Sequence, residues 1–198
     1  MTNNNKIIII GGGLAGCEAA YQISKFDINI DLYEMRPKVK TEAHQTKYLA
    51  ELVCSNSFRS DDKEYNAVGV LHEELRIADS LIMKCADHNK VPAGSALAVD
   101  RDNFSKEVNK TIKSIPNINI INQEVRSLDE FKNQLLIVST GPLTSKTLSE
   151  SIKIKTSENS LAFYDAIAPI VYEETINMSV AWKQSRYCLL YTSPSPRD

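Results

Sequence analysis

The sequence predicts an α/β fold: a doubly wound, Rossmann-like domain on a parallel sheet, followed by the start of a second domain. Three observations carry this prediction. An apolar run at residues 6–10 leads into a glycine-rich turn and then into a helical segment. A second strand pattern at residues 28–33 ends in Glu34. Further strand and helix patterns alternate along the chain, as they do in parallel α/β sheets.

The turn after the first strand has the Gly-x-Gly-x-x-Gly pattern of dinucleotide-binding domains, and each glycine of the pattern has a mechanical role. Gly11 permits the tight turn, Gly13 admits a pyrophosphate, and Gly16 lets the helix pack against the strand. The helix that begins near Leu14 directs free N–H groups and the positive end of its dipole at the phosphates. The cofactor-binding residues predicted for this turn are Gly11, Gly12, Gly13, Leu14, Ala15 and Gly16.

Two other strand ends complete the predicted site. Glu34 lies 18 residues after Gly16, where an acid accepts a hydrogen bond from a ribose hydroxyl. A carboxylate there disfavours a 2′-phosphate, so FAD or NAD fits better than NADP, and the motif leaves those two open. Thr140 and Gly141 follow a later strand and fit a second loop beside the cofactor. An ordinary tight turn before a helix explains them almost equally well.

The elements between these loops follow from apolar spacing and from proline positions. Pro37 makes Arg36 extended, so the second strand should end there. A strand at 95–99 precedes a helix that Asp102 caps and Pro116 stops. Two more strands are expected at 118–121 and 134–138. A single amphipathic helix is predicted from its buried stripe, which comprises Val68, Leu71, Leu75, Ala78, Ile82 and Cys85.

Composition bounds the class of protein. The chain has 198 residues and a net charge of −2, so RNA binding would need a local basic patch. No apolar run approaches the roughly 18 residues of a membrane span. The four cysteines and three histidines show no metal-ligand spacing. We therefore expect a cytoplasmic protein with no metal, no membrane association and no disulfide framework.

Four separated blocks, at residues 34–37, 50–59, 92–101 and 139–145, together resemble the family of folate- and FAD-dependent tRNA (uracil-5-)-methyltransferases. The resemblance covers about residues 6 to 187. The joint occurrence of the four blocks identifies the family more specifically than any one block does. It implies that NADPH reduces FAD and that the flavin carries one carbon from 5,10-methylenetetrahydrofolate to C5 of a T-loop uridine in tRNA. The alternatives are the wobble-uridine-modifying tRNA flavoprotein, a generic flavin oxidoreductase, and a non-catalytic truncated FAD-binding module.

The resemblance also implies a catalytic role for Cys54 at the flavin. The residue would be either the partner of a second family cysteine beyond this chain or a protector of flavin or base. Without the resemblance, the sequence supports two roles for Cys54 about equally, a small buried hydrophobic residue or a reactive thiol. The polar residues 55–57 favour a helix N-terminus, which would stabilise a thiolate. Cys17 and Cys85 are expected in the core.

The predicted domains are a FAD-binding domain at 1–145, the start of an inserted second domain at 146–187, and a non-native Ser/Pro-rich tail at 188–198. Because the family resemblance stops at Tyr187, we expect the intact protein, rather than this chain, to be active. Asp100 and Arg101 either contact a phosphate or flavin carbonyl or form a surface pair. Basic and aromatic residues around Trp182, namely Lys183, Arg186 and Tyr187, either contact RNA or flank a buried strand edge.

Overall fold

The computed structural model describes residues 6–157 and 172–181. It divides the chain into two compact units, Met1–Ile167 and Ala168–Asp198. The second unit is described only over residues 172–181, which contain a short 3-10 helix, η3 (Glu173–Thr175). The expectations for Trp182, Lys183, Arg186, Tyr187 and the tail lie outside the described residues. In the described part, no helix is long and apolar enough to cross a membrane.

A parallel four-stranded sheet forms the centre of the first unit, in the order β6-β2-β1-β7. Strand β1 pairs with both neighbours without a register shift. Its Ile8 lies opposite Asp31 of β2 on one side and Leu136 of β7 on the other. This sheet confirms the predicted fold class. Its strands are β1 (Lys6–Ile10), β2 (Asn29–Glu34), β6 (Ile118–Asn122) and β7 (Leu135–Val138).

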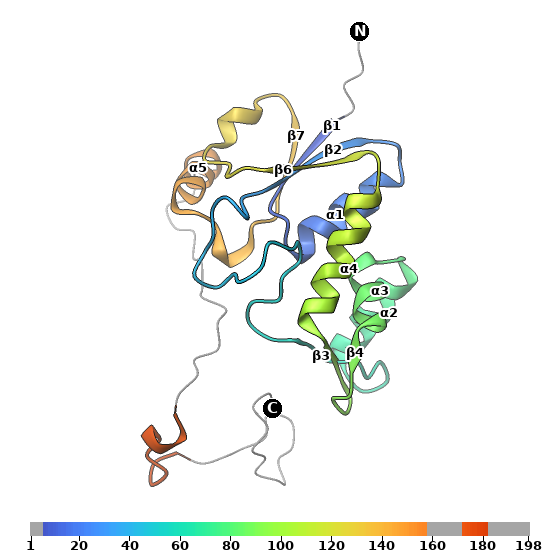
Figure 1. Ribbon diagram of the computed structural model, residues 1–198, viewed down its shortest axis with the longest axis vertical. Coiled ribbons are helices and arrows are strands. Elements are labelled where there is room, and N and C mark those ends of the chain that lie inside the picture. Colours follow the sequence, from blue (N-terminus) through green and yellow to red (C-terminus); the bar gives the residue numbers. More distant parts are fainter. Residues whose placement is uncertain (1–5, 158–171, 182–198) are drawn as a thin grey trace. The chain divides into compact units, whose positions relative to one another are not determined.

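Strand β1 supplies side chains to two cores, one on each face of the sheet, because successive residues of a strand point to opposite faces. Ile9 packs in the larger core with helices α1 (Leu14–Ser24), α3 (Leu81–His88) and α4 (Arg101–Ser114). Ile8 and Ile10 pack in a second core with Phe131 of the 3-10 helix η1 (Leu128–Phe131) and Leu148 of helix α5 (Lys146–Thr156). Helices α1 and α4 therefore cover one face and α5 the other (Figure 1).

The single helix predicted through residues 68–85 is wrong, because two helices occupy this stretch. They are α2 (Ala67–Ile77) and α3, and Asp79 between them has a left-handed φ of 61°. Ser80 then caps α3 by accepting the N–H of Met83. Leu71, predicted in the buried stripe, is 50% exposed. Helix α2 instead turns Gly69 inward, where any side chain would overlap the Asp62 backbone.

The strand predicted at 95–99 exists as β5 (Ala96–Val99), but it does not join the parallel sheet. It is the middle strand of a small antiparallel sheet with β3 (Ser57–Ser60) and β4 (Lys90–Val91). The helix after it, α4, is capped by Asp100 and not by Asp102, because the Asp100 carboxylate accepts the Asn103 N–H at 2.9 Å.

Helix α5 belongs to the same compact unit as the parallel sheet. Its Leu148 is buried in the second core. The first compact unit thus extends past residue 145. The functional domain boundary that the sequence predicts there stays a prediction.

Candidate cofactor site

A cavity of about 260 Å³ opens at the carboxyl ends of β1, β2 and β7. From β1 the sheet runs to β2 on one side and to β7 on the other, so the cavity lies at the switch point where open α/β sheets bind ligands. Gly16 and Cys54 are not among its lining residues. The predicted cofactor residues that line it together are Gly11, Gly12, Gly13, Leu14, Ala15, Glu34, Thr140 and Gly141.

The glycines of the turn differ in what surrounds them. Gly11 has φ +107°, and a Cβ there would lie 2.7 Å from the Ser139 carbonyl oxygen. A Cβ on Gly16 would overlap the carbonyl oxygen of Gly11, so this glycine permits the contact between helix α1 and the turn. Nothing lies within 4 Å of a Cβ on Gly13. Gly13 thus keeps space open beside the cavity, as a bound pyrophosphate requires.

Two helices begin at the cavity wall without a side-chain cap. Helix α1 starts after Gly13, and α5 starts after Ser145, which lines the cavity; neither residue caps its helix through a side chain. By contrast, Asn66, Ser80 and Asp100 cap α2, α3 and α4. The free N–H groups and positive dipole ends of α1 and α5 therefore face one cavity, an arrangement that favours a phosphate-bearing ligand.

Glu34 is buried beneath the glycine turn and is held by several donors. Its Oε2 accepts the Gly12 N–H at 3.1 Å. Arg36 donates its backbone N–H and Nε to Oε1, both at 2.9 Å, and Nη2 to Oε2 at 3.1 Å. Burial alone would raise the pKa of Glu34, but the hydrogen bonds and charge of Arg36 outweigh it and lower the pKa. A ribose hydroxyl would share this carboxylate with Arg36.

Arg36 and Glu51 line the cavity too, although neither was predicted from the sequence as a site residue. Arg36 is only 2% exposed, and its Nη1 donates to Glu51 Oε2 at 2.8 Å. Glu51 in turn accepts the N–H groups of Gln45 and Thr46. Arg36 therefore ties the end of β2 to the loop that precedes Cys54. The one signal in the sequence was an arginine two residues after Glu34, the acid predicted to accept a hydrogen bond from a ribose.

The second loop of the cavity is joined directly to the glycine turn. The Ser139 hydroxyl donates to the carbonyl oxygens of Ile10 and Gly11, at 3.0 Å each. Gly141 has φ +62° and opens the 3-10 helix η2 (Gly141–Leu143). Thr140 and Gly141 thus form a tight turn that is also part of the cavity wall.

Cys54 is half-buried and lies directly after the wall residue Val53. The predicted helix N-terminus after it is wrong. Asn56 instead donates its side-chain amide to the Val99 carbonyl, while its own carbonyl accepts the Val99 N–H, and strand β3 follows. Arg101, the first residue of α4, donates from Nη2 to the Cys54 carbonyl at 3.3 Å. Asp100 is engaged in capping, so the two residues do not form the surface pair considered above.

The other two described cysteines are core residues, as predicted. Cys17 is 0% and Cys85 2% exposed. Burial raises the pKa of both thiols, that of Cys85 to about 12. Neither is suited to act as a nucleophile near neutral pH. Among residues 6–157 and 172–181, no three His, Cys, Asp or Glu side chains are grouped to hold a metal.

The sheet, the glycine turn and the strand-end acid define an α/β dinucleotide-binding domain. The family model described as "Glucose inhibited division protein A" (GIDA) matches residues 6–194, and the chain belongs to this family. The match extends into the 188–198 segment, for which a non-native origin stays a prediction.

Curated relatives are similar over nearly the whole chain. The protein named methylenetetrahydrofolate–tRNA-(uracil-5-)-methyltransferase TrmFO from Bartonella henselae is 58% identical over 181 residues, covering 91% of this chain and 38% of that protein. The protein of the same name from Rhizobium meliloti is 54% identical over 186 residues, covering 94% and 39%. The chain thus spans about 40% of the length of these relatives.

Among solved structures, the GidA-related protein from Thermus thermophilus is 9% identical, with a TM-score of 0.39. The match covers 70% of this chain and 54% of that one. A likeness this weak adds nothing to the assignment.

Proposed function

We propose that the protein carrying this domain is a FAD-dependent methylenetetrahydrofolate–tRNA-(uracil-5-)-methyltransferase of the cytoplasm. It transfers one carbon from 5,10-methylenetetrahydrofolate to C5 of a T-loop uridine, with NADPH as reductant. The observation that carries the proposal is the 54–58% identity to TrmFO relatives over nine-tenths or more of the chain. The glycine turn, the two uncapped helices and Glu34 support the cofactor assignment.

FAD, when bound, supplies the redox and one-carbon chemistry, and the residues of this chain hold and orient it. The backbone N–H groups at the start of α1 and α5 bind the diphosphate, and Glu34 accepts a hydrogen bond from the ribose. Arg36 keeps Glu34 ionised and fixes the loop that leads to Cys54. Cys54 acts at the reaction centre beside the wall residue Val53.

Replacing Gly13 by Val is expected to remove bound FAD without unfolding the chain. The added side chain fills the space that the pyrophosphate needs, yet it meets no protein atom within 4 Å at Cβ. The measurement is the absorption of the desalted protein between about 350 and 500 nm, where a bound flavin absorbs. Thermal unfolding without added FAD serves as the control and should be unchanged. Flavin bands of full intensity in the variant would contradict the assignment.

Replacing Cys54 by Ala is expected to lower tRNA methylation by at least about 100-fold, the usual size of the loss when one catalytic group is removed. The assay is methyl incorporation into an unmodified tRNA transcript by the full-length protein. FAD retention and NADPH oxidation should change little, because Cys54 does not line the cavity. Undiminished methylation would leave Cys54 as a packing residue.

A further inference from the structure

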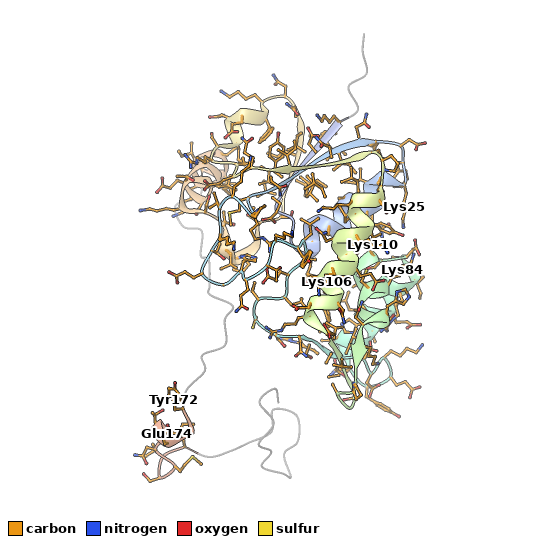
Figure 2. All side chains as sticks on the ribbon, in the orientation of Figure 1. Lys25, Lys84, Lys106, Lys110, Tyr172 and Glu174 are labelled. Atoms are coloured by element: carbon orange, nitrogen blue, oxygen red, sulfur yellow. The ribbon has the colours of Figure 1, made fainter. Side chains whose placement is uncertain are left out.

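The outer face of helix α4 carries a row of lysines. Lys106, Lys110 and Lys113 are exposed, whereas Phe104, Val108 and Ile112 on the opposite side are buried. Residues spaced by three and four lie on one face of a helix, and Figure 2 shows Lys106 and Lys110 following each other along α4. With 1.5 Å of rise per residue, these two are about 6 Å apart along the axis.

The charge of this row is not neutralised within the described residues. The ion pairs formed there do not include Lys106, Lys110, Lys113 or Arg101. Lys25 and Lys84, on helices that contact α4, are different because both pair with Asp79. Two acids lie beside the row. Asp102, four residues before Lys106, is exposed, whereas Glu107 is engaged by His88 Nδ1 at 2.8 Å and by the Asn89 side chain. The three lysines, none of which forms an ion pair within the described residues, therefore leave this face with an excess of positive charge on a chain whose net charge is −2.

The lysine row begins beside the loop that holds Cys54. Arg101 starts α4 and donates to the Cys54 carbonyl at 3.3 Å. A groove at this end of the helix is lined by two basic residues, Arg101 and Lys106, and by two acids, Asp100 and Asp102. The carboxylate of Asp100 is turned to the helix cap. A polymer that presents a base near Cys54 would thus have its backbone close to the start of the row.

We propose that the outer face of α4, formed by Lys106, Lys110 and Lys113, together with Arg101 at the start of the helix, contacts the phosphate backbone of the tRNA substrate. This inference rests on the proposed function, which supplies the RNA. Because this chain has no excess of positive charge, contacts with RNA phosphates need a local basic surface of this kind. Contacts of this kind position the RNA and carry no sequence information.

The test compares two double variants of the 198-residue chain, Lys106→Gln/Lys110→Gln and Lys132→Gln/Lys155→Gln. The second pair is a matched control, because Lys132 and Lys155 are also exposed but pair with Asp129 outside this face. Affinity for a fluorescein-labelled, unmodified tRNA transcript is measured by anisotropy at several salt concentrations. The α4 variant should bind on the order of a hundredfold more weakly at about 50 mM salt, and its salt slope should fall by about two. The control variant should bind like the unchanged chain.

Three outcomes would overturn the inference. They are equal affinity and slope in the two variants, no tRNA binding by the unchanged chain at low salt, and competition by polyglutamate as strong as by tRNA. FAD uptake is followed in the same samples, since none of these lysines lines the cofactor cavity. Retained FAD with equal tRNA affinity in the two variants would reject this surface alone, whereas failure of the unchanged chain to take up FAD would count against the cofactor site on which the proposed function rests.

Discussion

Replacing Arg36 by Met is expected to lower the free energy of unfolding by about 3–5 kcal/mol, because the change leaves buried carboxylates without their cation. Arg36 is 2% exposed, Glu34 is 6% exposed, and the guanidinium of Arg36 donates to both Glu34 and Glu51. Thermal unfolding measures the effect as a fall in Tm of more than about 6 °C for a chain of this size. The control is Arg126→Met, which breaks a pair whose arginine is 72% exposed and should change stability by less than about 1 kcal/mol.

The pH dependence distinguishes lost charge compensation from lost packing. In the unchanged protein the pKa of Glu34 is lowered, so its contribution is present at neutral pH and is lost as the pH falls through that pKa. Without Arg36, burial raises the pKa of Glu34, and the variant loses stability as the pH rises through the raised value. The difference in Tm between the two proteins should therefore be smaller at about pH 5 than at about pH 8. An equal difference at both pH values would point to packing.

Replacing Gly16 by Ala is expected to destabilise the domain by about 1–3 kcal/mol or more, the range for overpacking a close contact, and to abolish FAD retention. The new Cβ would overlap the Gly11 carbonyl oxygen and lie 2.7 Å from the Ser139 hydroxyl. The hydroxyl can rotate away, but the carbonyl belongs to the turn, so α1 has to move off β1. Chemical denaturation and the flavin spectrum measure the two effects.

Gly13→Ala is the matched control for this variant, since the same methyl group there meets nothing within 4 Å. It should leave the denaturation midpoint unchanged. A Gly16→Ala protein with the parent's midpoint and full flavin absorbance would show that α1 is not packed against the turn through Gly16.

The central part of the fold was predictable because its signals are local. The apolar run of β1, the glycine turn and the terminal Glu34 each specify their own conformation, and the parallel sheet follows from their order. The small antiparallel sheet was not predictable, because the apolar residues of β5 would suit either kind of sheet. The helix break at Asp79 also had no local signal, since a left-handed aspartate looks like any polar residue of a helix surface.

The residues of the candidate site could be predicted from the sequence where backbone geometry dictates the residue type. They could not be predicted where contacts between distant parts of the chain determine the role of a side chain. The glycines of the motif stand where a side chain would collide with backbone or fill the ligand space, so their positions at the cavity could be predicted from the motif. Arg36 was overlooked because an arginine before a proline suggests an exposed loop, and only the folded chain brings Glu34 and Glu51 to it. Ser55 and Asn56 suit helix caps, yet they serve a turn and the pairing with β5.

The pairing of β1 with β7 fixes the order of events when the protein is made. Ile10 lies opposite Val138, so the central strand has only β2 as a neighbour until the ribosome has added well over a hundred further residues. At typical synthesis rates of about 5–20 residues per second, this interval is on the order of ten seconds. The glycine turn emerges early but faces an incomplete sheet throughout that time. Flavin loading consequently cannot begin with the glycine turn alone, because it waits for β7 and the loop of Thr140 and Gly141 that completes the cavity wall.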